Sequence, residues 1–175
     1  MSPSGDRATA PVIQTLKMLV GAVVGALFLM AVALSFVLTF GPPSPGVLLI
    51  LLVLGVLSHV LIENVGYRAT AVPLDLDATA ARNRAVTVFR STLMMRLAMA
   101  ESVAFFGLVF AFMGRTVLAY DLGAAISVLL LALHVWPSRR SVDRVVANLE
   151  KDGAQTGLSE LLGFAGPTDG PIQRA

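Results

Sequence analysis

The sequence predicts an all-α integral membrane protein: a four-helix bundle of two transmembrane hairpins, followed by a cytoplasmic amphipathic C-terminal helix. Composition is the first observation that predicts this class. Of the 175 residues, 56% are hydrophobic and 14% are charged, and the mean hydropathy is +0.80, whereas soluble domains carry about 25% charge. The second observation is that no Asp, Glu, Lys or Arg occurs from Met18 to Ile62. That stretch is long enough for two spans of about 20 residues each.

The first two spans are separated by a proline-rich turn. Residues 41–46 contain three prolines, which cannot continue a helix because proline lacks the backbone N–H. We therefore expect span one over about residues 16–40 and span two over about residues 47–62. The link is short and uncharged, so the two helices should form a tight antiparallel hairpin. The apolar run after Lys17 is longer than the h-region of a signal peptide, which favours a retained span.

The third and fourth spans form a second predicted hairpin. The third apolar run covers residues 93–113, and the fourth covers about residues 117–136 and ends before Pro137. Residues 114–116 form the short link between them. A helical pattern returns near Thr79, so we expect the third helix to begin well before the hydrocarbon. Its basic first turns would then lie at the inner leaflet, where anionic lipids attract Lys and Arg.

Basic residues lie on one side of the predicted membrane. They precede span one, occupy the segment between spans two and three, and follow span four, and only Arg115 falls in an opposite link. Segments rich in Lys and Arg stay in the cytoplasm. We therefore expect cytoplasmic N- and C-termini and a cytoplasmic central loop. The Ala, Val, Leu and Arg bias favours a bacterial protein and hence a multi-pass protein of the bacterial inner membrane.

The segment after Pro137 has the pattern of an amphipathic helix, with Ser138 or Ser141 as a candidate N-cap. The apolar positions at helical spacing and the basic residues beside them are Val142, Val145, Val146, Leu149, Arg140 and Arg144. Such a face binds a membrane surface or a partner protein, or it covers the chain's own bundle. The sequence leaves these alternatives open.

The chain is therefore divided into three predicted parts. Residues 1–137 form the four-span transmembrane domain, and residues 138–165 form the cytoplasmic amphipathic helical segment. Residues 166–175 are rich in Gly, Pro and polar residues and are expected to be a disordered tail. Residues 1–11 are expected to be a frayed N-terminus.

Ionisable residues near or inside the predicted spans are costly and are therefore functional candidates. They are Glu101, Arg96, His59, Glu63 and His134. Glu101 is near mid-membrane, where a carboxyl carries a proton, binds a cation or forms an interhelical hydrogen bond, and we favour the hydrogen bond. Arg96 is close to the inner interface, where it anchors the helix or pairs with a glutamate of a neighbouring helix. His59, Glu63, Arg96 and His134 are at similar depth, which predicts a polar cluster.

Two further patterns concern metal binding and helix packing. Two histidines and two glutamates are metal-ligand types, but Arg96 would repel a cation, so we expect a hydrogen-bond network with no metal and no other cofactor. Gly21 and Gly25 form a Gly-x-x-x-Gly pattern, which favours close helix packing. We expect that packing within the bundle, with a homo-oligomer as the alternative.

Residues 101–111, with the sequence ESVAFFGLVFA, resemble the carboxylate helix of rotary ATPase proteolipid (c) subunits. In that family a membrane-embedded acid is followed by small residues, an aromatic residue and Gly-Leu-Val. The resemblance implies that Glu101 binds the transported proton or sodium ion. The long loop before the third helix and the basic C-terminal extension depart from the family. Ala100-Glu101-Ser102 also resembles a motif in the third span of uncharacterised bacterial four-helix membrane proteins.

Several function classes are excluded by what the sequence lacks. With 13 basic and 11 acidic residues and no cysteine, it lacks the charge of a nucleic-acid binder and the ligands of a thiolate metal site. It contains no nucleotide-binding or hydrolase motif, so we expect no enzyme.

We therefore expect a non-enzymatic accessory or structural subunit of a larger bacterial membrane complex, such as a transporter or respiratory assembly. Its partners would be the lipid bilayer and other membrane protein subunits. The alternative is a small proton- or cation-translocating membrane protein that uses Glu101. A further alternative is a lipid-binding protein or a membrane enzyme.

Overall fold

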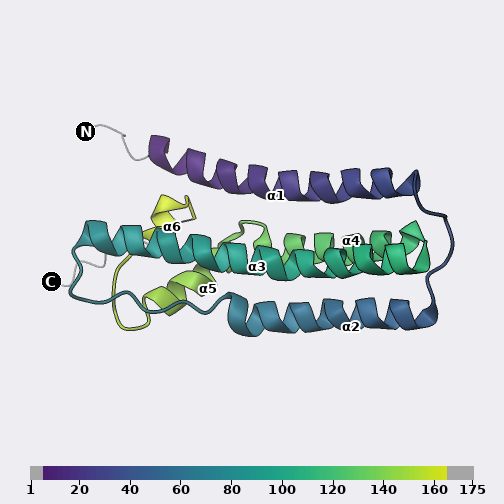
Figure 1. Cartoon of the computed structure of the whole chain (residues 1–175). Helices are drawn as coiled ribbons and strands as arrows, with labels where there is room; N and C mark the ends of the chain where they lie inside the picture. The colour runs from purple at the N-terminus through teal and green to yellow at the C-terminus, as the bar shows by residue number, and fades with distance from the viewer. Residues whose placement is uncertain (1–5, 165–175) are drawn as a thin grey trace. The chain divides into compact units, whose positions relative to one another are not determined.

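The structure, a computed structural model, describes residues 6–164, with side chains from Gln14 onward. Within this range all regular elements are helices (Figure 1): α1 (Asp6–Ser35), α2 (Pro45–Leu61), η1 (Ile62–Gly66), α3 (Ala78–Gly114), α4 (Val117–Leu130), η2 (Leu131–Val135), α5 (Arg139–Leu149) and α6 (Leu158–Leu161). The elements η1 and η2 are π-helical turns that continue α2 and α4. The predicted all-helical class is confirmed.

Four helices of the described chain are long and apolar enough to cross a membrane, as the sequence predicts. They cover Gln14–Ser35, Pro45–Gly66, Ala78–Gly114 and Val117–Val135. The third begins one residue before the expected Thr79. The first ends at Ser35, earlier than the expected residue 40, because residues 36–44 already form the turn. The expected frayed N-terminus is helical from Asp6 onward, while residues 1–5 lie outside the described range.

The chain divides into two compact units, which are described separately. The span unit contains residues 18–68 and 90–136, and the terminal unit contains the described parts of residues 1–17, 69–89 and 137–175. Residues 69–89, which the sequence analysis assigned to the four-span domain, thus pack with the C-terminal segment. The expected disordered tail, residues 166–175, lies outside the described residues.

In the span unit, the links of the two hairpins are joined to each other. Ser44 caps α2, because its Oγ accepts a hydrogen bond from the backbone N–H of Val47 at 3.4 Å. In the second link, Arg115 adopts a left-handed conformation with φ of 53°. The Arg115 carbonyl accepts hydrogen bonds from the Thr39 N–H at 3.2 Å and the Thr39 hydroxyl at 2.6 Å. The Thr39 carbonyl accepts one from the Val117 N–H at 3.0 Å, and together these bonds satisfy backbone groups of both links.

Helices α3 and α4 pack closely at a pair of glycines. A Cβ placed on Gly123 would lie 2.8 Å from the carbonyl oxygen of Val103, and one on Gly107 would lie 3.0 Å from that of Ala119. Only glycine permits such an approach of two backbones. By contrast, a Cβ on Gly21 or Gly25 would meet nothing within 4 Å.

The sequence expectation for Gly21 and Gly25 is therefore corrected. Both lie exposed on α1, so they do not mediate close packing within the bundle. Helix α1 is instead held by larger residues. The Tyr120 hydroxyl donates a hydrogen bond to the carbonyl of Leu27 at 2.9 Å, and Leu34 packs in one core with Val117.

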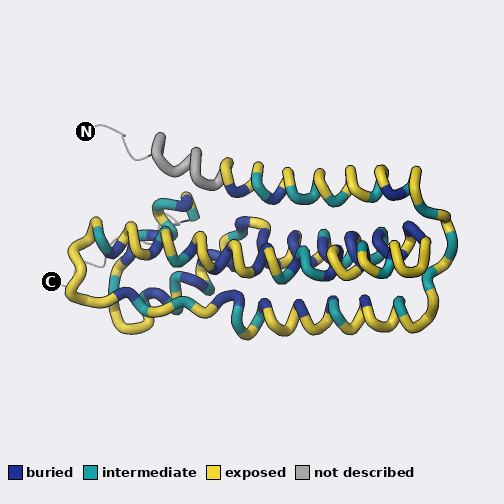
Figure 2. Tube along the Cα trace, viewed as in Figure 1, coloured by how far each residue is buried: buried dark blue, intermediate teal, exposed yellow. Residues whose placement is uncertain are grey.

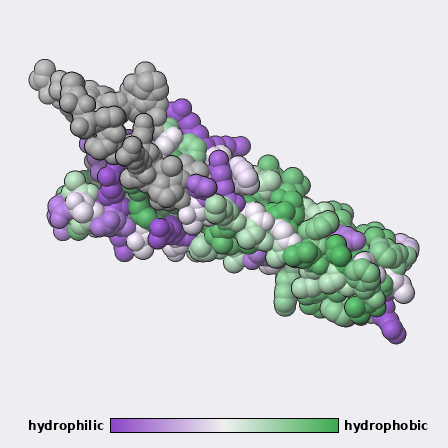
Figure 3. Space-filling model, turned by 90° about the horizontal axis from the view of Figure 1, so that it is seen from above, coloured by the Kyte–Doolittle hydropathy of each residue, from purple (hydrophilic) through white to green (hydrophobic). Residues whose placement is uncertain are grey.

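Apolar side chains cover much of the exposed surface of α1 and α2. Figure 2 shows both helices exposed along most of their described length, with buried positions at intervals. Large exposed side chains of these two helices include Phe28, Leu29, Val53 and Val56. Hydrophobic residues also gather over part of the face drawn in Figure 3. An exposed apolar surface of this kind marks a membrane or protein interaction surface.

In the terminal unit, α5 begins as the sequence suggests, with Ser138 as N-cap and Ser141 completing a capping box. Its side chains at Val142, Val145 and Leu149 are fully buried. The carbonyl of Leu149 also accepts a hydrogen bond from the N–H of Val72 at 2.9 Å. Of the three alternatives for this face, burial therefore supports a cover for the chain's own residues.

The same burial corrects the expected contact surface of α5. Val142, Val145 and Leu149 are not available to a membrane or partner in this structure, and Val146 is half-buried. Arg140 remains exposed and Arg144 is half-exposed, so the accessible face of α5 is its polar one.

Candidate functional site

Two π-helical turns mark the candidate site. The turn η1 ends the helix that contains α2, and η2 ends the helix that contains α4. Glu63 lies in η1, and His134 lies in η2. Such turns add a residue to a helical turn and occur frequently at functional sites. Here they place polar side chains of both hairpins side by side.

His134 is the centre of a polar cluster in the span unit. Its side chain is 3% exposed, and its two ring nitrogens face different groups. Nε2 lies 2.9 Å from Nδ1 of His59, at hydrogen-bond distance. Nδ1 lies 3.3 Å from the hydroxyl of Tyr67 and 3.6 Å from Oε1 of Glu63. The ring therefore links one hairpin to three side chains of the other.

Arg96 joins the cluster from α3 and is 1% exposed. Its Nη1 donates a hydrogen bond to the backbone carbonyl of His134 at 2.8 Å, and its Nε donates one to that of Thr92 at 3.2 Å. Its Cζ lies 4.4 Å from the ring centroid of Tyr67, within the range of a cation–π contact. Nη2 is buried and has no hydrogen-bond partner among the described residues.

The burial of Arg96 corrects the expectation of an interfacial anchor. Its side chain points into the span unit instead of extending to a surface. Gly66 makes room for it, because a Cβ at that position would lie 2.7 Å from Cγ of Arg96. Gly66, the last residue of η1, therefore leaves the space that the aliphatic part of the Arg96 side chain occupies.

The structure thus brings together four of the five sequence candidates: His59, Glu63, Arg96 and His134. Tyr67 is the member that the sequence analysis missed. It follows Glu63 by four positions and His59 by eight, and residues at these spacings share a helical face. That spacing is a signal in the sequence, although the turn η1 interrupts the regular helix before Tyr67.

The histidine nitrogens and the glutamate carboxylate of the cluster do not point to a single position at which a metal ion could bind. His59 faces Nε2 of His134, whereas Glu63 faces Nδ1 on the other side of the same ring. Within residues 14–164, no group of three His, Asp or Glu side chains is placed to hold a metal ion. The arrangement suits proton exchange, because each nitrogen of a neutral imidazole has a partner to which it donates or from which it accepts.

Glu101 lies outside this cluster. It is half-exposed on α3, and no hydrogen bond or ion pair joins its carboxyl to another residue of the described chain. The interhelical hydrogen bond that the sequence analysis favoured is therefore not formed between Glu101 and any residue that the structure describes.

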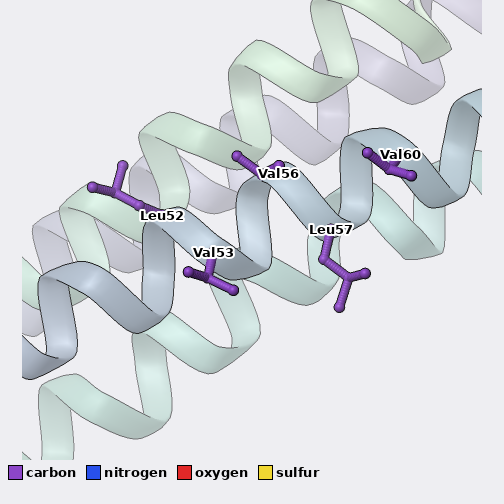
Figure 4. Close-up of a pocket in the computed structure, with 5 residues that line it drawn as sticks. All are labelled: Leu52, Val53, Val56, Leu57 and Val60. Carbon is purple, nitrogen blue, oxygen red and sulfur yellow. The ribbon is translucent and has the colours of Figure 1, made fainter.

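A groove on the surface of α2 is wholly aliphatic. Figure 4 shows the five residues that line it, all from this one helix: Leu52, Val53, Val56, Leu57 and Val60. None of these side chains offers a hydrogen-bonding group to orient a polar substrate. The groove therefore suits contact with an apolar chain or another apolar surface.

Comparison of the chain with protein-family models, curated proteins and solved structures gives no match. The resemblance of residues 101–111 to proteolipid subunits stays a prediction. Function is therefore argued from the positions of the side chains alone.

Proposed function

We propose that the chain is a non-enzymatic accessory subunit of a larger bacterial membrane complex, such as a transporter or a respiratory assembly. The observation that carries this proposal is the half-exposed Glu101, which has no hydrogen-bond or ion-pair partner among the described residues. A carboxyl in the middle of a membrane span is costly unless it is paired or hydrogen-bonded. A polar group of another subunit would satisfy it, so α3 presents a specific contact within an otherwise apolar surface.

The apolar surfaces of α1 and α2 agree with this proposal. Their exposed side chains, such as Phe28 and Val56, would face lipid or apolar surfaces of partner subunits. In the proposed orientation, both termini and the loop between η1 and α3 lie in the cytoplasm, in line with the distribution of basic residues. His59, Glu63 and His134 would then lie near the inner face of the membrane, and Glu101 would lie deeper.

The experiment is purification from native membranes in mild detergent, with the stoichiometry of co-purifying proteins as the measurement. We expect a larger partner in stoichiometric amount with the wild-type chain and with Glu101→Gln, because glutamine keeps a hydrogen-bonding group. With Glu101→Leu the partner should be lost. Met95→Leu is the matched control, since Met95 is an exposed apolar residue of α3 on a different face, and it should retain the partner.

A second candidate function is translocation of a proton or cation by Glu101, which the same half-exposed carboxyl favours because it is open to exchange. The two candidates give different results in this experiment. A homo-oligomer without any other protein would contradict the accessory-subunit proposal and favour translocation. Assembly that Glu101→Leu leaves intact would also contradict the proposed role of the carboxyl.

A further inference from the structure

We propose that Glu63, His134 and His59 form a proton-relay site, in which the buried imidazole of His134 passes a proton between the other two side chains. The ligand of this site is the proton. The inference goes beyond the accessory-subunit proposal, because it assigns chemistry to the cluster and needs no partner at Glu101.

The exposed fractions of the three side chains fit a proton relay. Glu63 is 33% exposed and the His134 side chain is 3% exposed, while His59 is exposed on α2. Two proton-binding groups at the surface of the chain are therefore separated by one buried ring. Because Glu63 and His59 face opposite nitrogens of that ring, a proton that enters at one nitrogen leaves at the other.

The cluster supports two hydrogen-bond patterns of opposite direction. In the first, Nδ1–H of His59 donates to Nε2 of His134, and Nδ1–H of His134 faces the Glu63 carboxylate. The Tyr67 hydroxyl then donates to the backbone carbonyl of His134, 3.4 Å away. In the second, Nε2–H of His134 donates to Nδ1 of His59, and the Tyr67 hydroxyl donates to Nδ1 of His134 at 3.3 Å. Every imidazole nitrogen between the three groups is satisfied in both patterns.

A proton transfer converts the second pattern into the first. A proton binds to the Glu63 carboxylate and passes to Nδ1 of His134, while the Nε2 proton of His134 passes to Nδ1 of His59. His59 is then an imidazolium and releases its own Nε2 proton to water at the inner face of the membrane, near which the proposed orientation places it. One proton has entered at Glu63 and one has left at His59, the carboxylate is regenerated, and both histidines are neutral. The reverse sequence carries a proton from His59 to Glu63.

The charged and titratable groups around His134 favour transfer of the proton to a neighbouring group over its retention on the His134 ring. Glu63, Tyr67 and His59 face the ring from the first hairpin, and Arg96 binds the carbonyl of the same residue from α3. A second positive charge on the ring would be repelled by the guanidinium. The Glu63 carboxylate offers a nearby acceptor on one side, and the His59 ring offers one on the other. The proton is therefore passed on instead of being held at His134.

The test uses the full chain in lipid nanodiscs with nitrogen-15 histidine. The sequence contains 2 histidines, so the imidazole spectrum reports on this cluster alone. We expect a nitrogen–nitrogen coupling across the hydrogen bond between His59 and His134. We also expect the His134 N–H to exchange with water far faster than its burial alone would allow. A missing coupling, or slow exchange in the wild-type chain, would overturn the proposal without any variant.

Glu63→Gln then separates a relay from a merely structural network. Glutamine preserves the size of the side chain but cannot shuttle a proton, so exchange at His134 should slow by about 100-fold, the low end of the contribution of a positioned acid–base group. The matched control is Glu160→Gln, an exposed glutamate of α6, which should leave the exchange rate unchanged. Equal rates in the wild-type chain and in folded Glu63→Gln would overturn the proposal.

Discussion

Nδ1 of His59 lies 2.9 Å from Nε2 of His134, although the two residues are 75 positions apart in the chain. Because His59 belongs to α2 and His134 to η2, this contact joins the first hairpin to the second. At the other ends of these helices, Thr39 pairs with Thr116. The two hairpins are therefore connected by polar contacts at both ends, and between these ends apolar side chains of both hairpins, such as Leu34 and Val117, pack in one core.

Topology is the first prediction. The chain contains no cysteine, so single cysteines report on sidedness without interference. We expect an impermeant thiol reagent added outside intact cells to label Ser44→Cys and to miss Thr70→Cys and Gln155→Cys. All three positions are exposed, whereas Thr116, in the other outer link, is buried and unsuitable. The reverse labelling pattern would contradict cytoplasmic termini.

The match between Gly66 and Arg96 gives a second prediction. Gly66→Ala should destabilise the folded chain by about 1–3 kcal/mol, because the new methyl group meets the arginine stem in a packed interior. Arg96→Ala should also destabilise it, since it leaves a cavity and unpaired carbonyls. In the double variant the cost of Gly66→Ala should largely disappear. Unfolding in detergent, analysed as a double-mutant cycle, measures this coupling, and additive effects would contradict the contact.

Glycine packing gives a third prediction, with a matched pair of variants. Gly123→Ala should destabilise the fold by about 1–3 kcal/mol, because its Cβ would meet the backbone of α3 and force the two helices apart. Gly25→Ala adds a Cβ in open space and should be neutral or slightly stabilising, since alanine is the better helix former. Thermal unfolding of both variants checks the difference. A larger loss for Gly25→Ala would instead support oligomer packing through α1.

The sequence predicts how deep each residue lies in the membrane, but it says little about how each helix is rotated about its own axis. The spans, the early start of α3 and the capping serine of α5 follow from local patterns of hydrophobicity, charge and capping. The similar depth of His59, Arg96 and His134 also follows, because the rise per residue of a helix is constant. Which way each side chain points depends on how the helices pack against each other, and that information is spread over the whole chain.

Three features illustrate the limit. Gly25 belongs to a Gly-x-x-x-Gly pattern, yet Gly123 makes the close contact. A pattern within one helix does not show which residues of another helix lie opposite it. Arg96 has the position of an interfacial anchor, but Gly66 opens space for it inside the span unit. The π-helical turns shift the register of two helices, and hydrophobic periodicity assumes regular turns. Such turns are therefore invisible to a sequence pattern.

Tyr67→Phe is the last prediction and concerns the direction of the hydrogen bonds around His134. The substitution removes the hydroxyl that lies 3.3 Å from Nδ1 of His134 but keeps the ring beneath the Arg96 guanidinium. The pattern in which Nδ1 accepts from Tyr67 is then lost, so His134 should favour the tautomer with its proton on Nδ1, facing Glu63. Nitrogen-15 imidazole shifts distinguish the two tautomers. Tyr67→Leu also removes the cation–π contact and should cost about 0.5–2 kcal/mol more stability than Tyr67→Phe. An unchanged tautomer ratio in Tyr67→Phe would mean that the hydroxyl bonds only the backbone carbonyl of His134.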